Sequence, residues 1–282
     1  MESADQIMVS EMFFESIAFI GGGQMAEALI KGILSRGIVS AENISCSEPN
    51  RNRREYIARE YGITVYAENV KAVSGAEAIV LAVKPQVISS VLQEIANTVD
   101  DTQLVISIAA GISTEFIEAG IGREKRVIRV MPNTPALVQQ GATALCRGSS
   151  ATVEDLARAR SLFEAVGVAV EVQESLMDAV TGLSGSGPAW CFTFMDALIQ
   201  AGVKEGLSRD VASTLAVQTV IGAAEICKQT GKEPAQLTAM VTSPGGTTIH
   251  GMYRLHEKGF TAAVMDAVSA ATARSRELGG NK

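Results

Sequence analysis

The sequence is poor in the residues that usually carry metal or acid–base chemistry. It has two histidines and four cysteines, and Cys46, Cys146, Cys191 and Cys227 are far apart and form no CxxC pair. Structural metal sites and disulfide frameworks show closely spaced or patterned ligands, so we expect neither. The cysteines are expected to be free thiols in a reducing cytoplasm.

Long apolar runs and blocks of one charge are also missing. No apolar run approaches the roughly 20 residues of a spanning helix, so no membrane partner is expected. The net charge is −7 without a basic cluster, which argues against a nucleic-acid partner, because such binding depends on Lys and Arg contacts to phosphate. Residues 1–16 lack Lys and Arg, which excludes a secretory signal, and we treat them as a lead-in segment of unknown role.

The first half of the chain alternates short apolar runs with helical patterns. Apolar runs without polar alternation are typical of strands buried on both faces of a sheet. The pattern predicts an α/β fold, with a Rossmann-type doubly wound parallel sheet over residues 17–173. The expected strands are 17–20, 44–47, 63–65, 78–83, 104–108, 127–130 and 169–172.

The second half, residues 174–282, is predicted to be an all-helical dimerisation domain. The pattern indicates helices at 188–205, 209–229, 234–241, 249–258 and 261–278. The helix at 209–229 has apolar residues almost all the way round, and such a helix is normally buried on every side. A domain this small cannot enclose it, so we predict a homodimer with this helix in the shared core.

A glycine turn follows the first expected strand and opens a helix. The pattern G-x-G-x-x-G/A is matched by Gly21, Gly22, Gly23, Gln24, Met25 and Ala26. In a βαβ unit these glycines permit a tight turn and let the backbone approach a pyrophosphate at the helix N-terminus. The turn therefore predicts NADPH or NADH as cofactor, the alternative being a purely structural turn.

The end of the second strand leaves the choice of coenzyme open. Glu48 stands where an acidic residue accepts hydrogen bonds from the ribose of NAD. Arg51, Arg53 and Arg54 follow closely and could bind the 2′-phosphate of NADP, or could simply form a solvated helix face.

Three further loops follow strands, where ligands bind in such sheets. Two of them contain Ala82, Val83, Lys84 and Pro85, and Ile108, Ala109 and Ala110; the third contains Asn133 between two prolines. Lys84 could act electrostatically on the reaction. Asn133 could be a preset hydrogen-bonding group, or part of an ordinary rigid turn.

At this point the chain resembles the pyrroline-5-carboxylate reductases, from Ile17 to about Leu278. The matching segments are Phe19–Ala26, Ala82–Pro85, Met131–Ala136, Asp178–Ala189 and Thr242–Ile249. The resemblance implies reduction of 1-pyrroline-5-carboxylate to L-proline by NADPH or NADH, and homodimers that can form a decamer of five dimers. It also implies cofactor contacts from Asn69 and the loops above, and substrate contacts from Ser243, Gly245, Gly246, Thr247 and Thr248. The family often has Ser near the position of Glu48, so coenzyme preference stays open.

The segment Ser243–Thr248 suits the substrate, because a helix N-terminus with two hydroxyls is a ready carboxylate site. The alternative is an ordinary helical turn capped by Thr247. No strong acid is evident, since adjacency alone does not aim His250 at a ligand. Our hypothesis is that positioning carries the reaction, with the Thr248 hydroxyl on the substrate nitrogen.

Two rival functions remain in view. A β-hydroxyacid dehydrogenase would need a lysine close to the Gly-rich segment 182–188, but the next lysine is Lys204. A non-catalytic dinucleotide sensor would have no need of the Ser243–Thr248 loop.

Overall fold

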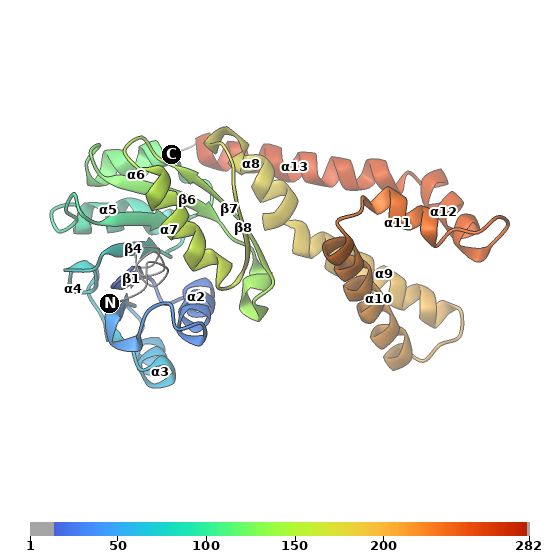
Figure 1. Ribbon diagram of the computed structural model, residues 1–282, viewed down its shortest axis with the longest axis horizontal. Coiled ribbons are helices and arrows are strands. Elements are labelled where there is room, and N and C mark those ends of the chain that lie inside the picture. Colours follow the sequence, from blue (N-terminus) through green and yellow to red (C-terminus); the bar gives the residue numbers. More distant parts are fainter. Residues whose placement is uncertain (1–13, 281–282) are drawn as a thin grey trace, which may run out of the picture. The chain divides into compact units, whose positions relative to one another are not determined.

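The computed structural model describes residues 14–280, which form two compact units (Figure 1). The first unit comprises residues 14–185 and 271–280, and the second comprises residues 186–270. The division therefore falls after the boundary expected at 173. The last helix, α13 (Phe260–Gly280), contributes its C-terminal residues to the first unit. The predicted lead-in segment lies almost entirely outside the described residues.

The first unit is built on one sheet with the strand order β3-β2-β1-β4-β5-β6-β7-β8. Its strands are β1 (Ile17–Ile20), β2 (Ile44–Ser47), β3 (Thr64–Tyr66), β4 (Ala78–Leu81), β5 (Leu104–Ser107), β6 (Arg126–Met131), β7 (Gly141–Arg147) and β8 (Gly167–Glu171). The first six run parallel, as predicted, whereas β7 runs antiparallel to β6 and parallel to β8. The sequence did not indicate β7, so the predicted parallel sheet has one antiparallel pair, β6–β7, near this edge.

Helices cover both faces of the sheet (Figure 1). One core contains Phe19 with residues of α2 (Gln24–Ser35), α3 (Arg51–Tyr61) and α7 (Val153–Glu164). The other contains Ile20 with residues of α4 (Asn69–Val73), α5 (Ile88–Ile95) and α6 (Thr114–Ile121). Neighbouring strand residues thus serve opposite cores, which explains why both are apolar.

The strand order reverses direction at β1. This strand pairs with β2 on one side and with β4 on the other. In doubly wound sheets ligands bind outside the carboxyl ends of the strands at this switch point. The glycine turn after Ile20 lies there.

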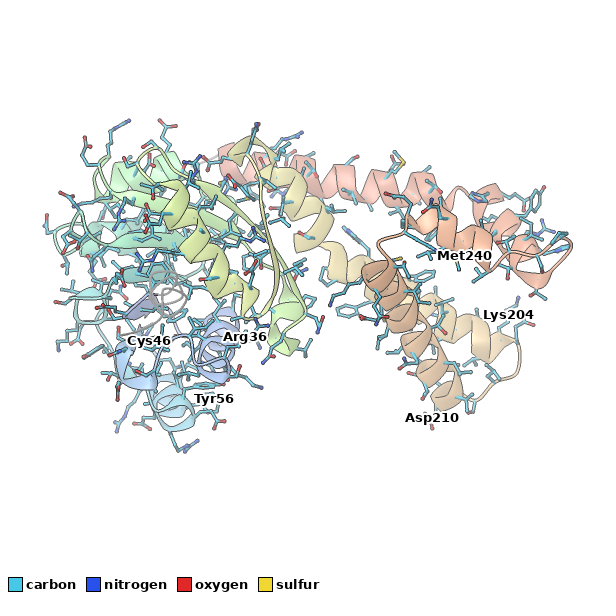
Figure 2. All side chains as sticks on the ribbon, in the orientation of Figure 1. Arg36, Cys46, Tyr56, Lys204, Asp210 and Met240 are labelled. Atoms are coloured by element: carbon cyan, nitrogen blue, oxygen red, sulfur yellow. The ribbon has the colours of Figure 1, made fainter. Side chains whose placement is uncertain are left out.

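The second unit is entirely helical, as predicted. It contains α9 (Gly187–Lys204), α10 (Arg209–Thr230), α11 (Pro234–Met240), α12 (Thr247–Glu257) and the first part of α13. Ser208 caps α10 by accepting a hydrogen bond from the Val211 amide, and Gly231, at φ 61°, ends it. Figure 2 shows Lys204 and Asp210 at the end of the α9–α10 hairpin where the turn lies.

The helix α10 has almost no core within its own protomer. Of its residues only Ala212 and Ala216 are buried. Its exposed large apolar side chains include Val211, Leu215, Val217, Ile221 and Ile226. By length and composition alone this helix could also cross a membrane, although no single apolar run in the sequence suggested one. An exposed apolar surface of this kind is normally buried in an interface, and α10 of a second protomer would bury it.

Candidate active site

The glycine turn is held between the ends of β2 and β4. The Gly21 amide donates a 2.9 Å hydrogen bond to the Ser47 carbonyl oxygen. Gly21 has φ 96°, and a Cβ atom there would lie 2.7 Å from the Ala82 carbonyl oxygen. Only glycine meets both conditions.

The next two glycines differ in their surroundings. A Cβ atom on Gly22 would lie 2.5 Å from Ile57 Cδ1, so this residue is packed against α3. Gly23 is exposed, and a Cβ atom there would meet nothing within 4 Å. Gly23 is also the N-cap of α2 and supplies no side-chain cap. The first amides of α2 thus have no side-chain cap, which fits a pyrophosphate group at this helix N-terminus.

Glu48 binds the same turn. Its Oε2 accepts a 3.1 Å hydrogen bond from the Gly22 amide, and its Oε1 accepts a 2.9 Å bond from the Asn50 amide. The carboxylate is half-buried and keeps lone pairs for a further donor such as a ribose hydroxyl.

The three arginines after Glu48 already have partners. Arg51 pairs with Glu55 on the exposed face of α3. Arg53 donates to the Gly22 carbonyl oxygen at 2.7 Å and forms an ion pair with Glu27. Arg54 Nη1 donates to the carbonyl oxygens of Glu48 and Pro49. Glu27 was not anticipated as a site residue, because no sequence spacing links it to Arg53.

The remaining predicted cofactor residues lie at the carboxyl ends of strands. The amides of Ala82 and Ile108 extend the ladder beyond β4 and β5. Val83 and Pro85 are half-buried, Ala109 is buried and Ala110 is exposed. Lys84 is exposed: its carbonyl oxygen accepts a 3.1 Å hydrogen bond from the Val87 amide, whereas its ammonium group forms no hydrogen bond or ion pair with the rest of residues 14–280.

Two asparagines of the predicted site also stabilise the protein itself. Asn69 accepts a 2.6 Å hydrogen bond from Ser47 and donates a 2.7 Å bond to Glu94. Asn133 is buried, donates to the Ser184 carbonyl oxygen at 3.0 Å and accepts from the Ala142 amide at 2.8 Å. Its carboxamide thus joins the loop after β6 to the start of β7 and to residues 181–185. A coenzyme contact from Asn133 remains a prediction.

The predicted substrate loop is a tight turn that leads into α12. The Gly246 amide donates to the Ser243 carbonyl oxygen at 3.0 Å, with Pro244 and Gly245 between them. Gly245 has φ 68°, and proline followed by a left-handed glycine is the pattern of a type II turn. Gly246 is the N-cap of α12 and supplies no side chain, so the alternative of a cap by Thr247 is wrong. Thr247 is exposed and Thr248 is half-buried.

His250 is engaged by its own helix. Its Nδ1 lies 2.9 Å from the Gly246 carbonyl oxygen. A carbonyl oxygen can only accept a hydrogen bond, so Nδ1 carries a proton and donates it to this bond. Nε2 takes no part in it. This bond turns the ring back along α12. Within residues 14–280, no group of three or more His, Cys, Asp or Glu residues could hold a metal ion.

Two family models match the chain. The model described as "Pyrroline-5-carboxylate reductase dimerisation" matches residues 174–278. The model described as "NADP oxidoreductase coenzyme F420-dependent" matches residues 16–111, which include the glycine turn.

Curated relatives match nearly the whole chain. A pyrroline-5-carboxylate reductase from Methanosarcina acetivorans is 47% identical over 265 residues, which cover 94% of this chain and 98% of the relative. One from Arabidopsis thaliana is 42% identical and covers 93% and 95% of the two chains. The chain belongs to the pyrroline-5-carboxylate reductase family. The predicted NAD(P)H-dependent reduction of 1-pyrroline-5-carboxylate to L-proline is thereby confirmed.

Solved reductases have the same fold. The structure of a pyrroline-5-carboxylate reductase from Coxiella burnetii has a TM-score of 0.90, with 35% identity over 94% of this chain and 98% of that one. The reductase from Plasmodium falciparum, solved with NADP bound, has a TM-score of 0.84 and 34% identity over the same shares. The prediction of a Rossmann domain followed by a helical dimerisation domain is confirmed.

Proposed function

We propose that the reductase binds its coenzyme on Gly21–Met25 and prefers NADH to NADPH. This preference is supported by the position of Glu48 beside the turn and by the three nearby guanidinium groups, which already have partners. A carboxylate at this position accepts from a 2′-hydroxyl and repels a 2′-phosphate. The relatives' frequent serine near this position, implied by the family resemblance, removes that repulsion.

The test compares kcat/KM for NADH and NADPH at saturating 1-pyrroline-5-carboxylate. We expect NADH to be favoured by about tenfold or more, because like charges at close range cost several kcal/mol. Glu48→Ser should shift the ratio toward NADPH. Glu60→Ser, which removes an exposed carboxylate from α3, is the control. An Arg51→Ala variant that loses NADPH affinity alone would contradict the proposal, because Arg51 would then be a phosphate ligand.

We propose further that the substrate carboxylate binds Ser243, Gly245, Gly246 and Thr247. The uncapped amides at the start of α12 and the neighbouring hydroxyls support this assignment, since a helix N-terminus favours an anion. The Thr248 hydroxyl would then hydrogen-bond the substrate nitrogen.

The nicotinamide, when bound, supplies the hydride for the imine carbon. The chain's own residues position the substrate and shield the reaction, and this loop is rich in donors and poor in titratable groups. Lys84 is free to stabilise negative charge near the end of β4. His250 is a poor candidate for the proton donor to nitrogen, because its Nδ1 proton is already committed to Gly246.

The dimerisation domain supports a homodimer. We propose that five such dimers form a decamer, as the family resemblance implies. Sedimentation velocity at micromolar concentration should show a species five times the mass of the dimer, and a single dimer peak at all concentrations would refute this.

We also propose that the enzyme works in the cytoplasm. All four cysteines are free and two of them are buried, which suits a reducing compartment. Fractionation of cells that express the native chain, followed by an activity assay, tests the proposal. Activity confined to a membrane or external fraction would refute it.

A further inference from the structure

The peptide groups of Gly22 are held from both sides. Glu48 Oε2 accepts from its amide at 3.1 Å, and Arg53 Nε donates to its carbonyl oxygen at 2.7 Å. Ile57 occupies the space where a side chain would begin. Arg53 and Gly22 are 31 residues apart in sequence, so the contact depends on the fold.

The Arg53 side chain contacts two other side chains, Glu27 and Tyr56. It forms an ion pair with Glu27, and its guanidinium lies 5.1 Å from the centre of the Tyr56 ring. The hydroxyls of Tyr56 and Tyr61 donate to Glu27 Oε1 at 2.9 and 2.7 Å. Figure 2 labels Tyr56 on α3 in this part of the first unit.

This cluster is charged and partly shielded from water. The side chains of Arg53 and Glu27 are 28% and 20% exposed. Burial disfavours the charged form of Glu27, but hydrogen bonds from Tyr61, Arg53 and Tyr56 hold the pKa of its carboxyl below its usual range. The ion pair therefore persists at neutral pH.

The direction of the next amide follows from the geometry of the peptide bond. In a planar trans peptide the carbonyl of one residue and the amide of the next point in opposite directions. With the Gly22 carbonyl bound by Arg53, the Gly23 amide points away from the cluster. The surroundings of Gly23 are open.

We propose that Arg53 is a positioning residue that fixes the Gly22–Gly23 peptide so that its amide faces the coenzyme pyrophosphate, with Glu27 holding Arg53 in place. The pyrophosphate is common to NADH and NADPH, so Arg53 acts equally on both. This inference rests on the proposed coenzyme site at Gly21–Met25. The competing role for Arg53 is a direct ligand of the 2′-phosphate, which would affect NADPH alone.

The test measures the Kd of NADH and of NADPH by coenzyme fluorescence for Arg53→Met. We expect both affinities to fall by about tenfold or more, because a hydrogen bond from a charged donor is lost. The ratio of the two Kd values should stay unchanged. The KM for 1-pyrroline-5-carboxylate should stay within about twofold of the parent enzyme, which would exclude general damage to the protein. Arg51→Met is the control, because the Arg51 side chain is exposed and bonds only Glu55 within residues 14–280.

Arg53→Lys separates positioning from stability. A lysine keeps a cation beside Glu27 but lacks the planar fork that serves Glu27 and Gly22 together. Compared with Arg53→Met, Arg53→Lys should recover more of the parent melting temperature than of the parent coenzyme affinity. Recovery of both in step would overturn the proposal, as would a loss confined to NADPH or unchanged affinities in Arg53→Met.

Gly21→Ala distinguishes this inference from the coenzyme site on which it rests. Its Cβ would press on the Ala82 carbonyl, so it should abolish binding of both coenzymes. If Gly21→Ala binds normally, the proposed coenzyme site is wrong. If it fails to bind while Arg53→Met binds normally, only the positioning role is wrong.

Discussion

Ser275 Oγ donates a 2.6 Å hydrogen bond to Asp178 Oδ1, which joins α13 to α8 (Met177–Val180) across 97 residues of sequence. Ser275 is buried and Asp178 is half-buried. Both belong to the first unit, so residues 271–280 are part of the body that carries the glycine turn.

We predict that Ser275→Ala lowers the free energy of unfolding of the first unit by about 1–3 kcal/mol, because it leaves a partly buried carboxylate without this donor. Urea denaturation measures the change. Ser269→Ala, an exposed serine on the same helix, is the control. Equal effects of the two substitutions would show that the hydrogen bond contributes nothing.

A substitution at Thr143 should raise, rather than lower, the free energy of unfolding. Its hydroxyl is buried, with the residue 3% exposed, and has no hydrogen-bond partner among residues 14–280. Thr143→Val removes the unsatisfied group at nearly the same volume. We predict that it raises the free energy of unfolding by about 1 kcal/mol. A lower melting temperature for the variant would contradict this.

Thr248→Ala tests the substrate loop. We predict that kcat/KM for 1-pyrroline-5-carboxylate falls by at least about tenfold, since a hydrogen bond to a charged partner contributes about 1.5–3 kcal/mol. The Kd of the coenzyme should not change. Thr230→Ala, at the end of α10, removes a hydroxyl from the same unit and serves as control. A change within about twofold would exclude Thr248 from the reaction.

The two buried cysteines provide a test of pH dependence. Burial, and secondarily the charges of Glu48 and Glu174, raise the pKa of both Cys46 and Cys146 from 9.0 to about 12. A raised folded-state pKa contributes stability that is complete below pH 9 and is lost as the pH rises toward 12. We predict that iodoacetamide leaves both thiols unmodified at pH 8, where exposed Cys191 is open to attack in the protomer. The Cys46→Ala, Cys146→Ala double variant should lose less stability between pH 9 and 12 than the parent.

Helices and strands could be predicted from the sequence where a single physical requirement determines the residue pattern. Strands buried on both faces must be apolar, so β1, β4 and β5 were predicted correctly, and the long helices α9 and α10 were found within one or two residues. The segment Gly141–Arg147 has no β-branched run, and its strand conformation depends on pairing with β6 and β8. The short helices α4 and α8 depend similarly on tertiary contacts.

The candidate site shows the same division. The glycine turn and the loop before α12 were readable because glycine and proline determine local backbone conformation. The partners of Arg53 and Asn133 could not be predicted, because each contact depends on how elements far apart in the sequence pack. Sequence spacing therefore left three arginines as equal candidates for a phosphate pocket.

The return of α13 to the first unit makes the coenzyme-binding body discontinuous in sequence. During synthesis, its sheet emerges from the ribosome long before residues 271–280 exist. The first unit therefore cannot complete its folding until the whole helical unit has been translated. Full protection of α8 in a stalled-chain proteolysis experiment should appear only once residues 271–280 have emerged from the ribosome, so completion of this unit follows synthesis of the helical unit.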